Sequence, residues 1–129
     1  MRVLLDTHVL LWWQHDSSRL RPETRQLLAD SRNELIWSAA STWELGIKLQ
    51  LGKVRIDEPL HQFVTRIVVE QSLVAMPIHH AHAAYVADLP PIHRDPFDRL
   101  LLAQASVEDV PLLTADAQLS AYGIRCLPA

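Results

Sequence analysis

Short apolar runs recur along this chain, and segments with helical character separate them. The runs lie at residues 3–5, 35–37, 73–76, 112–114 and 124–127. Apolar runs of this length suit strands that are buried on both faces, as the strands of parallel sheets are. Their alternation with helices predicts an α/β domain built around a mostly parallel central sheet.

The intervening segments carry helix signals. Helices are expected at residues 7–14, 22–30, 60–71 and 79–89, from Pro96 onward, and in a short segment from Asp116. Pro22 and Pro96 suit the first turn of a helix, where the missing N–H of proline has no cost. Each predicted strand is thereby separated from the next by at least one helical segment.

One segment, residues 39–51, is ambiguous. Apolar residues occupy alternate positions from Trp43 to Leu51, which alone favours a strand. Ser41 as a cap and Gly52 as a stop favour a helix. Such a helix would carry two apolar stripes, one of them from Trp43 to Leu51, and would be covered on two sides. We favour the helix.

Composition sets broad limits. The chain has 129 residues, 49% of them apolar and 21% charged, so we expect a single globular domain over residues 1–129. Asp6 interrupts the first apolar run, which argues against a signal peptide, and no run has membrane-spanning length. The one cysteine, Cys126, fits a reducing compartment, so we expect a cytoplasmic protein without membrane contact.

The net charge of −3 taken alone argues against a nucleic-acid partner. A group of carboxylates that holds a metal ion would count differently, because the rest of the chain would then be slightly positive. The overall charge therefore excludes little.

Two acids directly follow predicted strands. Asp6 comes after the first apolar run, and Asp116 comes two residues after the run at 112–114. Ligands of parallel α/β sheets bind beyond the carboxyl ends of the strands, so both acids fall at the functional edge. Each could also serve simply as the N-cap of the helix that follows.

Glu44 has a plain explanation in an ion pair with Lys48, one helical turn later, worth about 0.2–0.5 kcal/mol. Its position beside Trp43 and between two apolar stripes suggests more enclosure than a solvated charge has. Asp95 is well explained as the cap before Pro96. Asp98 fits either a capping box with Asp95 or a metal site.

Acids brought together at this edge would repel one another strongly without a cation. Clusters of oxygen ligands suit Mg²⁺ or Mn²⁺ rather than zinc. Such ions polarise phosphoryl oxygens and activate water for hydrolysis. The carboxylates thus point to metal-dependent phosphate chemistry.

Four stretches together resemble the PIN-domain nucleases, and in particular the VapC-type toxins of bacterial toxin–antitoxin pairs. They are "LLDTHVLLW", "SAASTWELGIKLQLGK", "HRDPFDRLLLAQA" and "LLTADAQLSAYG", and they span Leu4 to Gly123. The resemblance implies a three-layer α/β/α PIN-like domain with acids around one or two Mg²⁺ or Mn²⁺ ions. It places the catalytic and metal-binding acids at Asp6, Glu44, Asp98 and Asp116.

The resemblance also implies supporting residues. Thr7 and Thr114 match hydroxyl residues that hydrogen-bond a carboxylate or water beside the site, and Asp95 matches an accessory acid. Arg94 and Arg99 flank the third acid and are candidates for phosphate contacts, although Arg99 suits a solvated helix charge equally well. Lys48 is a weaker candidate of the same kind.

The implied activity is hydrolysis of RNA phosphodiester bonds by the toxin of a type II toxin–antitoxin system. The implied partners are an RNA substrate, a VapB-like antitoxin and a second copy in a homodimer.

Three alternatives compete with this hypothesis. A haloacid-dehalogenase-like phosphotransferase would use Asp6 as nucleophile, but its usual second acid is replaced here by His8. A zinc site could use His79 and His82, but no second pair completes a tetrahedral set. A non-catalytic interaction module could present one of the adjacent residues Trp12 and Trp13, which cannot share one helix face.

Overall fold

The computed structural model describes all residues, 1–129, and has an all-parallel sheet of five strands in the order β3-β2-β1-β4-β5. The strands are β1 (Arg2–Leu5), β2 (Glu34–Ser38), β3 (Val74–Met76), β4 (Leu112–Thr114) and β5 (Cys126–Pro128). Each contains or overlaps one of the apolar runs. The expected α/β organisation is confirmed, and the sheet is entirely rather than mostly parallel.

The helices follow the predicted segments closely. They are α1 (Thr7–Gln14), α2 (Pro22–Ala29), α3 (Ala39–Gln50), α4 (Leu60–Glu70), α5 (His80–Tyr85) and α6 (Pro96–Glu108), with 3₁₀ helices η1 (Val86–Asp88) and η2 (Ala117–Tyr122). The helix expected at 79–89 is thus shorter and continues as η1. None of these helices combines the length and apolar character that crossing a membrane requires.

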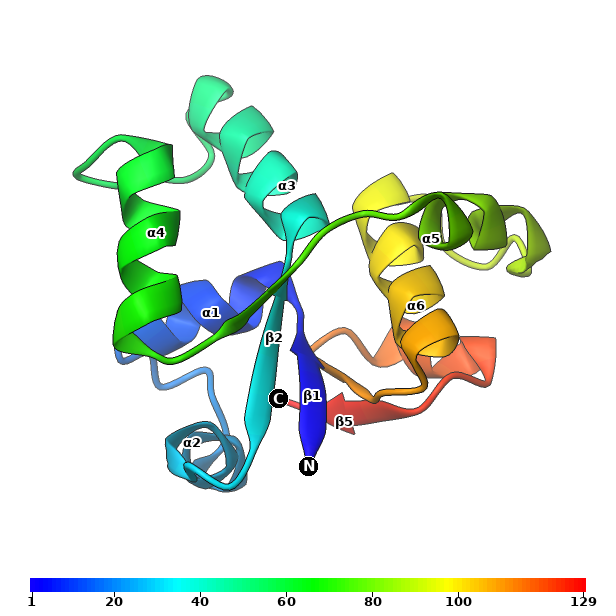
Figure 1. Cartoon of the computed structure of the whole chain (residues 1–129), viewed down its shortest axis with the longest axis horizontal. Coiled ribbons are helices and arrows are strands. Elements are labelled where there is room, and N and C mark those ends of the chain that lie inside the picture. The colour runs from blue at the N-terminus through cyan, green and yellow to red at the C-terminus, as the bar shows by residue number, and fades with distance from the viewer.

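Successive side chains of the central strands enter two separate cores. Val3 and Leu5 of β1 belong to one core, and Leu4 belongs to the other. This follows from strand geometry, because neighbouring side chains point to opposite faces. In Figure 1, α1, α2 and α4 lie on one side of the sheet and α5 and α6 on the other. The three-layer α/β/α arrangement is therefore confirmed.

The ambiguous segment is helix α3, which contacts α1, α4 and α6. Ser38, and not the predicted Ser41, caps this helix. The hydroxyl oxygen of Ser38 accepts the N–H of Ala40. Leu45 is fully buried, but Trp43 and Leu51 remain 58% and 62% exposed. The prediction that the stripe from Trp43 to Leu51 is covered is therefore wrong. Helix α3 lies beyond the end of the sheet (Figure 1), so the sheet does not cover this stripe.

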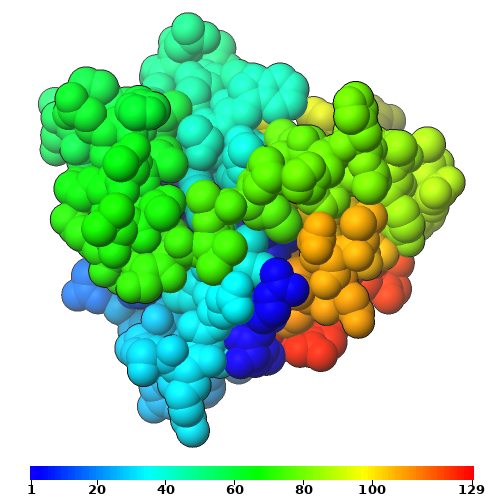
Figure 2. All heavy atoms as spheres, in the orientation of Figure 1, coloured from blue at the N-terminus to red at the C-terminus, as the bar shows by residue number.

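The order of the strands places β1 in the middle of the sheet, so Asp6 lies at the centre of the carboxyl edge. β3 is an edge strand, and the green segment that contains it crosses the front of the molecule between α4 and α5 (Figures 1 and 2). β1 lies between β2 and β4, with Leu5 in register with Leu113. Asp6, which follows β1, and Thr114, the last residue of β4, are therefore neighbours at the carboxyl edge.

Candidate active site

Asp6 occupies the N-cap position of α1 without capping it. Its backbone is extended, yet its side chain accepts no hydrogen bond from the first turn. Instead Oδ2 accepts the hydroxyl of Thr114 at 2.7 Å, while Oδ1 is buried and has no hydrogen-bond partner. Capping therefore does not explain this carboxylate, which is only 5% exposed.

The surroundings of Asp6 disfavour its negative charge. Burial is the main cause that raises the pKa of this carboxyl, and the charge of Glu44 raises it further. The hydroxyl of Thr114 and the neighbouring His8 act in the opposite direction. A buried carboxylate with one unpartnered oxygen is the environment that a bound cation would stabilise.

Glu44, on α3, is 2% exposed and has partners on both oxygens. Oε1 accepts the hydroxyl of Thr7 at 2.7 Å, and Oε2 lies 2.7 Å from Nζ of Lys48. Thr7 Oγ1 is also 2.8 Å from the hydroxyl of Ser41. The expected ion pair with Lys48 is confirmed. The expected burial of Glu44 is confirmed as well, since its side chain is 3% exposed.

Asp95 and Asp98 divide their tasks at the start of α6. The Asp95 carboxylate accepts the N–H groups of Phe97 and Asp98 at 2.8 and 3.2 Å, so the predicted cap is confirmed. The capping box does not form, because the N–H of Asp95 donates to Nδ1 of His93. The side chain of Asp98 is thereby left for the site.

Asp98 is surrounded by the other carboxylates of the cluster. Its pKa is raised to about 8, first by burial and then by the charges of Asp6, Asp95, Glu44 and Asp116. Like charges that converge in a partly dry environment cannot all remain ionised without compensation. Asp98 therefore lies where the negative potential of the site concentrates.

Asp116 combines both roles that its sequence allowed. Its Oδ1 caps η2 by accepting the N–H of Gln118 at 3.0 Å. Its Oδ2 lies 3.3 Å from Nε2 of His93, at the acid cluster. Capping and membership of the cluster are compatible because the two oxygens face different partners.

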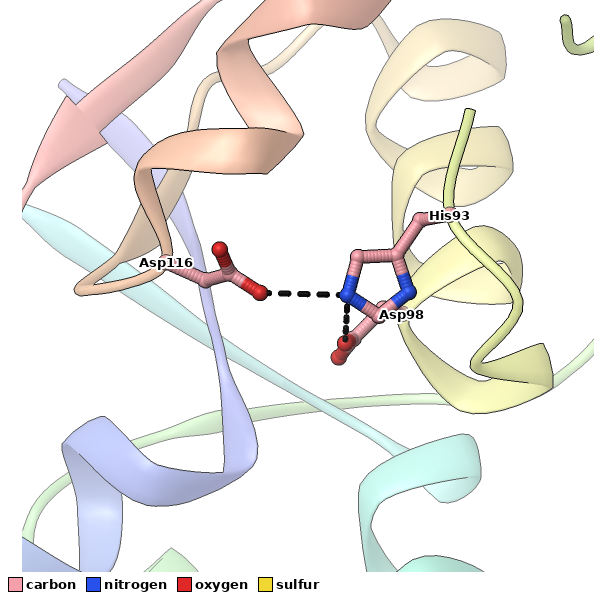
Figure 3. A group of neighbouring side chains, drawn as sticks. All are labelled: His93, Asp98 and Asp116. Carbon is pink, nitrogen blue, oxygen red and sulfur yellow. Dashed lines mark ion pairs between the residues drawn. The ribbon is translucent and has the colours of Figure 1, made fainter. Parts of the chain in front are cut away.

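His93 is a site residue that the sequence did not single out. It projects between Asp98 and Asp116 (Figure 3), with Nε2 at 3.7 and 3.3 Å from their carboxylates. One ligand atom from each of the three residues lies within 4.8 Å of the others. Because Nδ1 accepts the N–H of Asp95, the neutral ring carries its proton on Nε2, facing the acids. Its place as the first residue of the stretch "HRDPFDRLLLAQA" was the available signal, but other histidines have equally ordinary contexts.

The two flanking arginines differ. Arg99 donates to the carbonyl oxygens of Pro90 and Val86 at 2.8 and 3.2 Å, and to the hydroxyl of Tyr122 at 3.3 Å. It therefore ties down the segment before α6 and is not simply solvated. Arg94 is exposed and makes no ion pair within 4.0 Å.

The zinc alternative loses its ligands. Nδ1 of His82 accepts the N–H of His79 at 3.0 Å, and Nε2 lies 2.8 Å from the Glu108 carboxylate. Both nitrogens of this fully buried ring are engaged within the protein.

The predicted acids converge at the carboxyl edge of the sheet. Asp6, Asp98 and Asp116 line one cavity of about 340 Å³, and Glu44 is close enough to raise the pKa of two of them. The donor set consists mainly of carboxylate oxygens, and it includes the unpartnered Asp6 Oδ1. These residues fit a hard divalent cation. Fold and site together define an α/β/α domain with an acidic centre whose oxygen atoms fit a divalent cation.

The PIN-domain family model matches residues 3–124, so the chain belongs to the PIN-domain family. This membership confirms the expected fold and argues against the haloacid-dehalogenase alternative. Two relatives come from Mycobacterium tuberculosis. Ribonuclease VapC16 is 36% identical over 63 residues, which are 49% of this chain and only 45% of that relative. Ribonuclease VapC22 is 29% identical over 121 residues, 93% of this chain and 91% of the relative.

Solved structures share the fold at low sequence identity. VapBC2 from Rickettsia felis, bound to a DNA fragment from its promoter, superposes with a TM-score of 0.73 at 14% identity, covering 100% of this chain and 99% of that one. VapBC-1 from nontypeable Haemophilus influenzae gives 0.66 at 15% identity, covering 99% and 98%.

Proposed function

We propose that this protein is a metal-dependent endoribonuclease and the toxin of a type II toxin–antitoxin pair. Support comes from its family and from VapC22, a named ribonuclease that aligns along nearly the whole chain. The observation that carries the proposal is the buried Asp6 Oδ1, which has no partner although four acids converge around it. A cation at this place would satisfy that oxygen and offset the repulsion.

Asp6, Asp98 and Asp116 are the residues that would hold the ion directly. Glu44, whose oxygens are engaged by Thr7 and Lys48, would contribute through water. Oxygen ligands favour Mg²⁺ or Mn²⁺. When bound, such an ion polarises a phosphoryl oxygen and lowers the pKa of coordinated water.

The remaining site residues orient the acids. The hydroxyl of Thr114 fixes the Asp6 carboxylate, and Thr7 with Lys48 fixes Glu44. The ring of His93 places Nε2 3.7 Å from the Asp98 carboxylate and 3.3 Å from the Asp116 carboxylate. Asp95 holds the first turn of α6, from which Asp98 projects. Side chains held in this way are placed before substrate arrives.

The attacking water is oriented by Asp98 or Asp116, which line the cavity together, and one of these carboxylates accepts its proton. Arg94 is exposed beside the third acid and contacts phosphates of the RNA. Arg99, bound to carbonyl oxygens, adds positive potential and holds the preceding segment.

The partners follow from the same assignment. Several structural relatives are VapBC complexes, by their names, and we propose a VapB-like antitoxin for this chain. We also propose a homodimer. Light scattering on a size-exclusion column tests the dimer, and an active monomer at low concentration would refute it.

The central experiment compares wild type with Asp6→Asn and Asp98→Asn on total RNA with Mg²⁺ or Mn²⁺. Each variant should lose on the order of 10²–10³-fold in cleavage, because a metal-holding carboxylate is removed. Asp57→Asn, on an exposed side chain far from the cluster, is the control and should cleave normally.

A second readout does not depend on turnover. Divalent ion at a hundred times its Kd should add about 2.7 kcal/mol to the unfolding free energy of wild type, which is measured as a rise in melting temperature. The rise should be much smaller for Asp6→Asn. A folded Asp6→Asn protein with undiminished cleavage would contradict the assignment of that residue. A folded wild type that neither cleaves RNA nor binds the ion would favour the non-catalytic interaction module.

A further inference from the structure

The cavity lined by Asp6, Asp98 and Asp116 also has lining residues that are not acidic. They are His8, Trp12 and Arg19, together with Ala115. His8 and Trp12 are one helical turn apart on α1, and Arg19 lies in the segment after it. We call His8, Trp12 and Arg19 the basic wall. A guanidinium, an imidazole and an indole thus share a cavity of about 340 Å³ with three carboxylates.

Arg19 is the only arginine or lysine that lines this cavity, and it forms no ion pair with the acids of the cavity. Its side chain makes no ion pair within 4.0 Å of any carboxylate, although many arginines of this chain do. The guanidinium carbon lies 5.7 Å from the centre of a Trp12 ring, in cation–π range. Arg19 is thus positioned by an aromatic ring and keeps its hydrogen-bond donors available.

Trp12 gives this arrangement a firm base. Its side chain is half-buried and packs against the core between α1 and the sheet. The ring of His8 lies 6.0 Å from that of Trp12, and its Nε2 is 3.5 Å from Nζ of Lys48. Both Trp12 and His8 are therefore held at the cavity by neighbours, while His8 remains exposed.

RNA needs local contacts of this kind here because the overall charge of the chain provides no attraction for its phosphates. The net charge is −3, and a metal ion offsets charge only at the phosphate it contacts. Single-stranded RNA is bound by cations that follow its phosphates and by aromatic rings that stack on its bases. A guanidinium is well matched to phosphate because its planar donors can bind two oxygens.

We infer that the basic wall is the subsite for the nucleotide next to the cleaved bond. Arg19 binds the phosphate of that nucleotide, Trp12 positions Arg19 and supports the base, and His8 adds a hydrogen-bonding group at the rim. This inference rests on the proposed ribonuclease function and extends it to how the substrate is held.

The test measures RNA binding without turnover and cleavage with turnover. Binding of a random-sequence 20-nucleotide RNA is followed in the Asp6→Asn background over a salt series. Arg19→Ala should weaken binding about tenfold and reduce the salt slope by about 0.7, since one phosphate contact is lost. Arg19→Lys should keep the slope. Trp12→Leu should weaken binding several-fold, and Trp12→Phe should restore most of it.

In the otherwise unaltered protein, Arg19→Ala should raise KM about tenfold with kcat within twofold of wild type, as expected when binding is lost equally in ground and transition states. The matched control is Arg32→Ala, at the opposite edge of the sheet, where the arginine is exposed and paired with Asp30. Arg32→Ala should leave KM and salt slope unchanged.

Separate outcomes overturn the two proposals. If wild type cleaves RNA and Arg19→Ala matches Arg32→Ala in KM and salt slope, the subsite is wrong and the basic wall serves a protein partner instead. If wild type neither binds nor cleaves RNA, the ribonuclease proposal fails and the subsite fails with it. Circular dichroism establishes that each variant is folded. Should Arg19→Ala not fold, loss of the salt slope in Arg19→Lys would overturn the subsite.

Discussion

Two buried polar clusters meet on α6, and they differ in how completely their atoms are satisfied. In the first, here the His82 cluster, Gln104 accepts from the hydroxyl of Ser38 and donates toward the Pro77 carbonyl and His82, while His82 faces Glu108. In the second, the acid cluster of Asp6, Glu44, Asp98 and Asp116, charges of one sign converge and Asp6 Oδ1 has no partner.

The contrast separates stability from function. A buried network whose members are paired rigidifies a fold, because every group regains the hydrogen bond it had in water. A cluster of like charges with an open oxygen is electrostatically unfavourable, and a bound proton or an added cation relieves it. One helix thus supports a structural cluster in its later turns and a functional one in its first turn.

Breaking the His82 cluster should have the largest effect on stability. Gln104→Ala removes the partner of Ser38, Pro77 and His82 at once, and we expect a loss of about 2–4 kcal/mol in unfolding free energy. Urea denaturation measures it. Gln62→Ala, on the exposed side of α4, is the control and should stay within about 0.5 kcal/mol of wild type. Equal stability of the two variants would show that the network contributes nothing.

Removing a charge from the acid cluster should instead stabilise the metal-free protein. The pKa of Asp98 is about 8 in the folded state against its ordinary value of 3.8, so the folded protein holds an extra proton between these pH values. Its unfolding free energy therefore falls as pH rises from about 4 to about 8. In EDTA at pH 8, Asp98→Asn should be more stable than wild type by the order of 1–3 kcal/mol, a gain that vanishes near pH 4.

Melting curves over this pH range measure the effect, and Asp57→Asn, on an exposed side chain, should show no such dependence. Divalent ion should then reverse the order of wild type and Asp98→Asn, since only wild type retains the full ligand set. A wild type that is more stable than Asp98→Asn in EDTA at pH 8 would argue that the acid cluster is already compensated by the protein.

The smallest effect should come from the hydroxyl that orients Asp6. Thr114→Val keeps the shape of the side chain but removes its donor, and we expect about 1 kcal/mol of destabilisation. Divalent-ion affinity should fall by about 10–100-fold, because the carboxylate is no longer held in place. Calorimetric titration measures this affinity, with Thr65→Val on exposed α4 as the control. Unchanged affinity would mean that Asp6 is oriented by other contacts.

Much of the fold was predictable because local patterns specify it. The apolar runs give the strands, and Pro22 and Pro96 mark helix starts that the structure confirms. Asp95 caps α6 as its sequence indicates. Residues 39–51 were harder, because alternation and capping gave opposite signals and only the position of α3 beyond the sheet leaves Trp43 exposed.

The site was predictable in part. The resemblance of four stretches to PIN-domain nucleases implied the four acids, and the hydrogen bonds expected of Thr7 and Thr114 are present. His93 was not found, because a histidine in a loop carries no periodic signal. Arg99 was assigned to solvent or phosphate, while its actual partners are carbonyl oxygens distant from the helix pattern around it.

The sequence by itself determined which segments along the chain are strands and which are helices. It also placed acids at strand ends and in the first turns of helices, since these features depend on neighbouring residues alone. Only the tertiary structure decided that Asp6 serves as an enclosed carboxylate and not as a cap. β4 lies beside β1, and the hydroxyl of Thr114 at its end donates to the Asp6 carboxylate. That contact joins residues 108 positions apart, and burial at the junction of the strands is what converts an ordinary aspartate into a group that needs a cation.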